Sequence, residues 1–284
     1  MNLTAKANAK INLTLDIVGK REDGYHLVDM IMQTVSLYDT VRVTKTDSGI
    51  RVLSSDNTLG GQEDITYKAA KLFFEKTGII GGVEIKVDKN IPVAAGLGGG
   101  STDAAAVLLL LNRLYENPLD IKTLEEIAIK LGADVPFFLY GGTIAVSGIG
   151  EIFEKLPDMP KCHLVIAKKG VKPSTKEMYE VIDNTDVSSF RPNNIAAKKA
   201  IENANLNILC ENINNVFSAA WETDEIALIM KECGALAVSL SGSGPSYFGI
   251  FDNENHAKTA AECLNNLKIA AFYAVPTEKG SVIE

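Results

Sequence analysis

A glycine-rich stretch stands between two segments of opposite character. Four glycines fill the five positions from Gly96 to Gly100, after the alternating segment 83–87 and before the helix-forming segment 104–115. Glycine lets the backbone approach a ligand closely. We expect Ser101 where the helix begins, and free N–H groups and the positive helix dipole attract anions there. The order of strand, loop and helix therefore predicts a site for a nucleotide's phosphates and disfavours a flexible linker.

This loop matches neither of the common nucleotide-binding fingerprints. A Walker A motif requires a lysine before the hydroxyl residue, where this chain has Gly100. The dinucleotide motif GxGxxG requires a glycine where this chain has Ser101. The predicted phosphate site must therefore be of another kind.

Two residues far from this loop are candidates for phosphoryl transfer to an alcohol, which needs charge compensation and a carboxylate that accepts the hydroxyl proton. Asp134 stands in apolar company in the segment 132–138, and Lys10 stands near Asn12 in the first strand. A nearby cation would lower the pKa of a desolvated carboxyl. Each residue also has a purely structural explanation, because Asp134 is placed to cap a turn before Pro136 and Lys10 to be a solvated lysine at a strand edge. The residues alone leave both alternatives open.

Recognisable elements surround these residues. Alternation predicts a strand over 6–15, with Lys6, Asn8, Lys10 and Asn12 on one face, and a further strand over 27–43 after the turn at 22–24. Asp64 is expected to cap a helix that ends before Gly78, and a second helix is expected over 123–131. Later helices are expected at 195–204, 212–221 and 225–233, and strands at 143–146, 164–167, 237–240 and 247–251.

Bulk properties restrict the kind of protein. A length of 284 residues favours two domains, and the charged segment 151–161 suggests the boundary, so we expect domains of 1–155 and 156–284. The net charge of -8 disfavours nucleic-acid and membrane binding. With no apolar run of 18 residues and no leader, the chain is expected to be soluble and cytoplasmic, as a monomer or weak homodimer. The four cysteines form no CxxC pair, which disfavours a zinc or redox site.

Three stretches together resemble the GHMP kinase superfamily, named for galactokinase, homoserine kinase, mevalonate kinase and phosphomevalonate kinase. Residues 92–103 resemble its central P-x-x-x-G-L-G-[GS]-[GS]-S-[ST]-D motif, residues 10–13 its first motif and residues 240–245 its third. The three span nearly the whole chain. The resemblance implies a two-lobed α+β fold, with an N-terminal lobe like a ribosomal protein domain, a ferredoxin-like C-terminal lobe and the active site between them.

The resemblance also implies site roles. Asp134 corresponds to the general base and Lys10 to its electrostatic partner, with ATP and Mg²⁺ as cofactors. Ser101 and Asp103 are the nearest metal candidates, but the metal ligands stay open. The residues implied to contact ATP are Pro92, Val93, Ala94, Ala95, Gly96, Leu97, Gly98, Gly99, Gly100, Ser101 and Thr102.

Within the superfamily, residues 21–26 resemble the R-x-D-G-[YF]-H stretch of the cytidyl-substrate kinases. This implies that Tyr25 and His26 meet cytidine. Residues 170–179 resemble a family segment with a threonine and, four residues later, an aromatic ring stacked on cytosine, which implies that role for Tyr179; the alternative is that its ring only packs a helix. The implied substrate is a cytidine diphosphate alcohol, phosphorylated on its C2 hydroxyl in non-mevalonate isoprenoid synthesis. The residues implied to contact it are Asn12, Tyr25, His26, Ile149, Thr175, Tyr179, Ser241, Gly242, Ser243 and Gly244.

Three alternatives remain. A homoserine or mevalonate kinase lacks the Tyr25-His26 and Tyr179 features, and a non-catalytic ATP-binding regulator would not need Lys10 and Asp134. An RNA-binding module is disfavoured by the net charge of -8.

Overall fold

Two separate β-sheets organise the chain in the computed structural model, which describes residues 1–56, 60–171, 173–221 and 225–284. The first sheet has seven strands in the order β11-β1-β2-β4-β3, with β5 paired to β2 and β6 to β5. Its strands are β1 (Asn2–Lys20), β2 (His26–Thr46), β3 (Gly49–Ser54), β4 (Gly82–Asp88), β5 (Thr143–Gly148), β6 (Ile152–Lys155) and β11 (Ser281–Ile283). Only the β3–β4 pair is parallel among the described strand pairs of this sheet.

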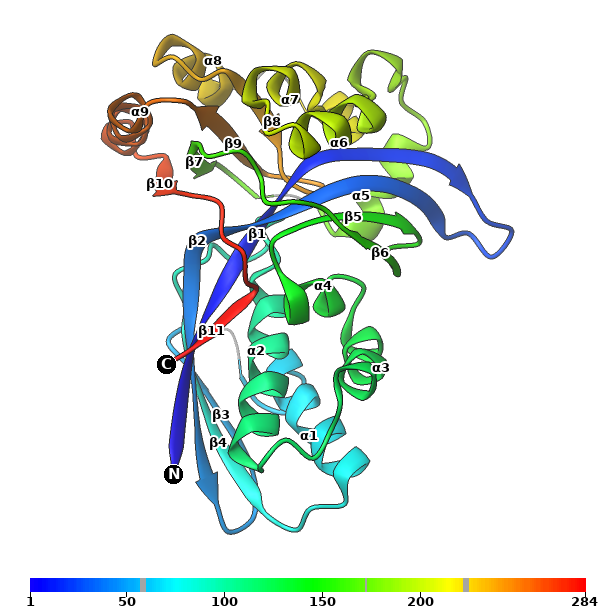
Figure 1. Ribbon diagram of the computed structural model, residues 1–284, viewed down its shortest axis with the longest axis vertical. Helices are drawn as coiled ribbons and strands as arrows, with labels where there is room; N and C mark the ends of the chain where they lie inside the picture. The colour runs from blue at the N-terminus through cyan, green and yellow to red at the C-terminus, as the bar shows by residue number, and fades with distance from the viewer. Residues whose placement is uncertain (57–59, 172, 222–224) are drawn as a thin grey trace.

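Strands β1 and β2 form a long antiparallel hairpin that connects the lower and upper parts of the molecule in Figure 1. The predicted alternation of β1 is present, but its polar face is buried: Asn8, Lys10 and Asn12 are enclosed together with their apolar neighbours. The structural explanation of Lys10 as a solvated lysine at a strand edge is therefore wrong. The reason is tertiary, because loops from both parts of the chain cover this face.

Four helices pack on one side of the first sheet (Figure 1): α1 (Ile65–Thr77), α2 (Gly99–Leu114), α3 (Ile121–Leu131) and α4 (Val135–Tyr140). As predicted, the Asp64 carboxylate caps α1, and Gly78 follows the helix with a φ of 67°. The helix α2 begins two residues before Ser101, because Gly98, with a φ of 72°, takes the N-cap position. Pro136 lies in the first turn of α4, a short helix that was not predicted.

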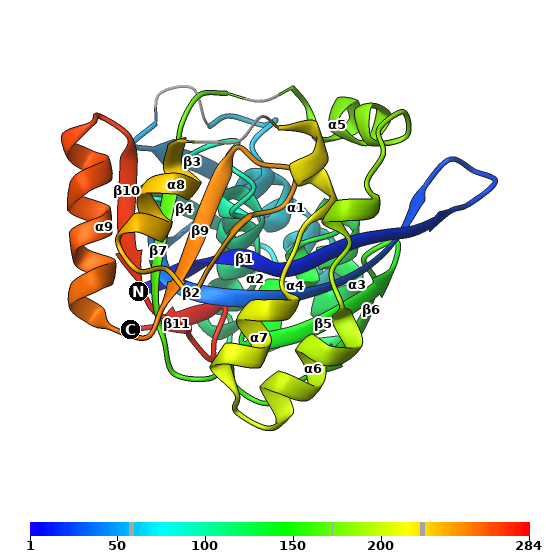
Figure 2. The same ribbon diagram turned by 90° about the horizontal axis from the view of Figure 1, so that it is seen from above.

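The second sheet has four strands in the order β10-β7-β9-β8. It contains β7 (His163–Lys168), β8 (Ala237–Leu240), β9 (Ser246–Phe251) and β10 (Ala270–Ala274). Its helices are α5 (Thr175–Ile182), α6 (Asn194–Glu202), α7 (Leu206–Asn212), α8 (Glu225–Glu232) and α9 (Glu254–Asn266), the last lying beside β10 in Figure 2. The two-lobed α+β expectation is confirmed. Because β11 returns to β1, the boundary at 155/156 stays a prediction.

One helix prediction in the second part is wrong. Instead of a helix over 212–221, α7 ends at Asn212 and a 3-10 turn covers Val216–Ala220. Asn215 separates them: its side chain accepts from the Phe217 N–H and donates to the Leu240 and Gly242 carbonyls. A buried side chain that satisfies backbone groups in this way competes with helix formation. None of the described helices combines the length and apolarity that a bilayer crossing demands.

A buried ionic cluster holds the start of the glycine loop. The Lys89 ammonium contacts both Asp39, on β2, and Asp103, on α2, and all three side chains are nearly inaccessible. Asp39 also accepts the N–H groups of Asn90 and Ile91, at 2.5 and 2.7 Å. Burial opposes the charge on Lys89, but the two carboxylates outweigh it and raise its pKa. Burial, together with the charge of Asp39, raises the pKa of Asp103.

Substituting Lys89 tests this cluster. Lys89→Met leaves two enclosed carboxyl groups facing each other without a cation, so we expect the free energy of unfolding to fall by about 3–5 kcal/mol. The measurement is urea denaturation at pH 7. The matched control is Lys86→Met, which removes an exposed lysine three residues earlier, on β4, paired with Asp88, and should change stability by at most about 0.5 kcal/mol. Equal losses in the two variants would contradict the role of the cluster.

Candidate active site

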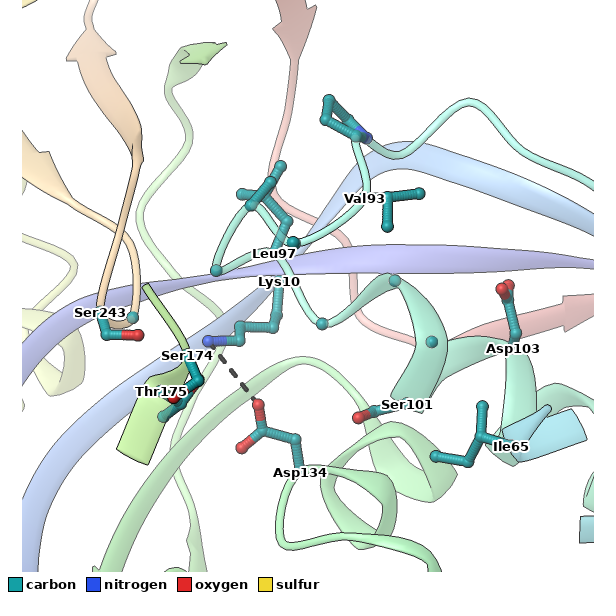
Figure 3. A pocket seen from close by; sticks show the side chains of 18 of the residues that line it. Lys10, Ile65, Val93, Leu97, Ser101, Asp103, Asp134, Ser174, Thr175 and Ser243 are labelled. Atoms are coloured by element: carbon teal, nitrogen blue, oxygen red, sulfur yellow. Dashed lines mark ion pairs between the residues drawn. The ribbon is translucent and has the colours of Figure 1, made fainter. Parts of the chain in front are cut away.

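The three stretches singled out in the sequence meet at one place (Figure 3). The backbone N–H of Lys10 donates to the Leu97 carbonyl at 3.0 Å, which attaches β1 to the glycine loop. The side-chain oxygen of Asn12 accepts the Gly242 N–H at 2.9 Å, which attaches β1 to the β8–β9 loop. The Ser241 hydroxyl donates to the Gly96 carbonyl at 3.0 Å and closes the triangle.

The glycine loop owes part of its composition to a neighbouring loop rather than to a ligand. Gly96 has a φ of +77°, and a Cβ atom there would lie 2.2 Å from the Ser241 carbonyl oxygen. No side chain caps α2 at Gly98. The first backbone hydrogen bond of this helix runs from the Thr102 N–H to the Gly98 carbonyl. The preceding N–H groups of α2 are therefore open to an anion, as the sequence predicts.

Lys10 and Asp134 face one another beside this helix end, with Nζ and Oδ2 3.9 Å apart (Figure 3). Lys10 donates to Asn12 Oδ1 at 2.5 Å and its side chain is only 5% exposed, whereas that of Asp134 is 38% exposed. Burial lowers the pKa of Lys10, and the charge of Asp134 offsets this in part. Asp134 occupies the N-cap position of α4, but its side chain makes no capping bond. Its carboxylate is thus directed to the cavity and not to the helix.

Two cavities, of about 720 and 800 Å³, meet at Asp134, and Lys10 lines the first of them. Both are lined by Met30, Ser101, Asp134, Thr175 and Tyr179. Of the predicted residues, the first cavity is also lined by Lys10, Asn12, Pro92, Val93, Ala94, Ala95, Gly96, Leu97, Gly98, Gly99, Gly100, Gly242 and Ser243. The second is lined by Tyr25, His26 and Ile149. The site thus has two compartments, and the carboxylate of Asp134 lies where they join.

Three predicted contact residues line neither cavity. Thr102 is fully enclosed in α2, and Ser241 uses its hydroxyl on the Gly96 carbonyl. Gly244 lies against Trp221, whose ring would be 2.9 Å from an added Cβ atom. These residues shape the loops that bear the site.

Aromatic rings form one wall of the second cavity. Tyr179 stacks on His26 with ring centroids 4.6 Å apart and meets Phe217 edge to face. Burial raises the pKa of Tyr179 to about 12. Tyr25 is 61% exposed in the turn of the β1–β2 hairpin. The sequence predicts a base on the Tyr179 ring, whereas here the His26 ring lies on it, and the role of Tyr179 stays a prediction.

The sequence analysis missed several residues of these walls. Met30 accepts a hydrogen bond from the Asn12 amide at its sulfur, at 3.3 Å, and Phe217 supports Tyr179. Asp183 and Lys20, in the wall of the second cavity, pair with each other. Only Lys89, in the wall of the first cavity, carried a signal in the sequence, because it lies three residues before the family motif at 92–103.

The site offers few metal ligands. Within the described ranges no group of three His, Cys, Asp or Glu side chains is suited to hold a metal ion. Of the two candidates, Asp103 is bound to Lys89 at 2.6 Å, and Ser101 lines both cavities. A divalent ion fits this donor set only when phosphate oxygens supply most of its ligands.

Comparisons with known proteins agree with this geometry. The model of the GHMP kinases N terminal domain matches residues 64–142, and that of the GHMP kinases C terminal matches residues 194–269. A 4-diphosphocytidyl-2-C-methyl-D-erythritol kinase of Caldicellulosiruptor bescii is 45% identical over 266 residues, which cover 91% of this chain and 93% of that protein.

Solved structures give the same result. The crystal structure of a 4-(cytidine 5'-diphospho)-2C-methyl-D-erythritol kinase superposes with a TM-score of 0.82 at 33% identity, covering 96% of this chain and 98% of that one. A homoserine kinase from Cytophaga hutchinsonii, at 21% identity and a TM-score of 0.79 over 100% of this chain and 97% of that one, shares the fold. The chain belongs to the GHMP kinases, and among them to the family of the 4-diphosphocytidyl-2-C-methyl-D-erythritol kinases.

Proposed function

We propose that this protein transfers the γ-phosphoryl group of ATP to the C2 hydroxyl of 4-diphosphocytidyl-2-C-methyl-D-erythritol, giving the 2-phosphate and ADP in non-mevalonate isoprenoid synthesis. The observation that carries the proposal is the position of Asp134. Its carboxylate stands 3.9 Å from Lys10 where a cavity lined by the glycine loop joins one lined by His26 and Tyr179. A group that takes a proton during transfer must touch both compartments.

The roles of the residues follow from their surroundings. Asp134 accepts the proton of the attacking hydroxyl, and the ammonium of Lys10 holds the pair aligned. The N–H groups at the start of α2 bind phosphate oxygens of ATP. A positioned base contributes about 10²- to 10⁴-fold in rate, so alignment and charge compensation supply the larger share.

Mg²⁺ is proposed as the companion of ATP rather than as a resident of the protein. Ser101, which lines both cavities, is the side chain placed to complete its coordination. When bound, the ion neutralises charge on the phosphate oxygens. Asp103 is not proposed as a ligand, because its carboxylate is bound to Lys89.

We propose further that the partners are small molecules only and that the protein works in the cytoplasm as a monomer or weak homodimer. The net charge of -8 supports the exclusion of nucleic acids and anionic membranes as partners, because both repel an acidic protein. The acidic chain must then bind a diphosphate substrate through local donors such as Lys10 and the N–H groups of the β8–β9 loop.

An assay of ADP release tests the function. We expect turnover with 4-diphosphocytidyl-2-C-methyl-D-erythritol and none with homoserine or mevalonate, because only the first has a base that fits the aromatic wall of the second cavity. CDP should inhibit competitively against the alcohol. Turnover with homoserine or mevalonate alone would refute the proposal.

Removing the charge of Asp134 tests its role. Asp134→Asn keeps the shape but cannot accept a proton, so kcat should fall by about 10²- to 10⁴-fold while the KM for ATP stays within about twofold. Steady-state kinetics with the preferred alcohol provide the measurement. Asp158→Asn, at an exposed position outside both cavities, is the control and should behave like the wild type. Full activity of Asp134→Asn would remove the assignment.

The pH dependence tests the charge of Lys10. Because burial lowers the pKa of Lys10, its ammonium loses the proton before the pH reaches 10.5, the ordinary pKa of lysine. The kcat/KM for ATP should therefore decline as the pH rises towards that value. Lys10→Arg retains a charge at all accessible pH values, so its reduced activity should lack this alkaline decline. An identical decline in both proteins would assign it to another group.

A further inference from the structure

The turn of the β1–β2 hairpin is clamped at its base by a residue of the second part of the chain. Lys20 and His26 are the last paired residues of the hairpin. Asp183, directly after α5, contacts both: its Oδ2 lies 2.5 Å from Lys20 Nζ, and its Oδ1 lies 2.7 Å from His26 Nε2. All three side chains line the second cavity.

A second contact fixes the plane of the His26 ring. Tyr179, on α5, lies one helical turn before Asp183, and its ring stacks on that of His26 with an interplanar angle of 22°. This helix, which ends immediately before Asp183, has a complete capping box formed by Ser174 and Glu177. The edge and the face of the imidazole are therefore both held by one rigid element.

The clamp determines which nitrogen of the ring carries the proton. An ionised carboxylate only accepts hydrogen bonds, and hydrogen bonds from Lys20 and His26 lower the pKa of Asp183. The proton of the neutral imidazole therefore lies on Nε2, and Nδ1 is an acceptor. Among the described residues no protein group hydrogen-bonds to Nδ1.

An acceptor at Nδ1 distinguishes the two common pyrimidines. Cytosine carries an exocyclic amine, which donates, where uracil carries a carbonyl, which only accepts. We infer that Asp183 is a positioning residue that selects cytosine over uracil by fixing His26 in the Nε2–H tautomer. The inference rests on the proposed function, because it assumes that the second cavity receives the base. A wrong tautomer would leave a polar group of the base unpaired in the cavity.

The wild-type protein provides the first test. The chain has only 3 histidines, so ¹⁵N NMR of the imidazole nitrogens can resolve His26, with a His26→Gln sample for assignment. We expect the Nε2–H tautomer with an unprotonated Nδ1. A neutral ring protonated on Nδ1 would overturn the inference, and this measurement requires no folded variant at Asp183.

The second test measures the ratio of the affinities for CDP and UDP. Asp183→Asn has an amide that can donate to Nε2, which favours the opposite tautomer. We expect CDP to bind about tenfold more weakly or worse, UDP to bind no more weakly, and the KM for ATP to stay constant. The matched control is Asp186→Asn, which removes an exposed carboxylate that bonds the Ser188 N–H and not His26. Its CDP-to-UDP ratio should equal that of the wild type.

The outcomes separate this inference from the function on which it rests. If the wild type binds CDP and the CDP-to-UDP affinity ratio is unchanged in Asp183→Asn, only the role of Asp183 is overturned. Failure of the wild type to bind CDP at all would overturn the proposed function with it. Equal weakening of CDP and UDP in Asp183→Asn would reduce the residue to a structural clamp and also overturn the inference.

Discussion

The buried ammonium group of Lys10, whose charge is only partly compensated, determines how three distant stretches of the chain are arranged around the site. Enclosing a charge costs several kcal/mol unless partners and hydrogen bonds offset it. Lys10 has the Asn12 oxygen at 2.5 Å and the Asp134 carboxylate only at 3.9 Å. The same Asn12 oxygen accepts the Gly242 N–H, so the residue that stabilises the cation also holds the β8–β9 loop. Displacing the glycine loop or the β8–β9 loop would expose the Lys10 ammonium or leave it without a hydrogen-bonding partner. The three stretches are therefore held together.

A second lysine near the site, Lys89, has its charge fully compensated by neighbouring carboxylates. Lys89 contacts the two carboxylates of Asp39 and Asp103, and its pKa is raised, whereas the pKa of Lys10 is lowered. Lys89 is thus committed to structure, since its charge is neutralised before any ligand arrives. Lys10 retains unsatisfied positive charge, which an anionic phosphoryl group would complete. In a chain of net charge -8, leaving one cation undercompensated is an effective way to attract phosphate to a single point.

What the sequence predicted correctly was mostly local or came from the family resemblance. The Asp64 cap, Gly78 and the order of strand, loop and helix are signals within a few residues. By contrast, nothing local indicated that Gly96 must make room for the Ser241 carbonyl, or that Asn215 would interrupt a helix, because both depend on chain segments far away. The α9 helix was missed although Asn253 and Glu254 offered a cap and an acidic first turn. Asp183 had no signal, since its partners Lys20 and His26 come from a distant hairpin.

The two compartments differ in how firmly they are built, and this difference matches what each must do. The glycine loop is held by enclosed groups, namely the Lys89 cluster and the Ser241 hydroxyl, which resist displacement. The hairpin that bears His26 projects from the rest of the molecule in Figures 1 and 2. Its link to Asp183 consists of the hydrogen bond of His26 and the ion pair of Lys20, whose side chain is 48% exposed, and such an exposed ion pair contributes at most about 1 kcal/mol. The phosphate end is therefore held more firmly, as in-line transfer requires, than the exposed turn of the hairpin at the base end.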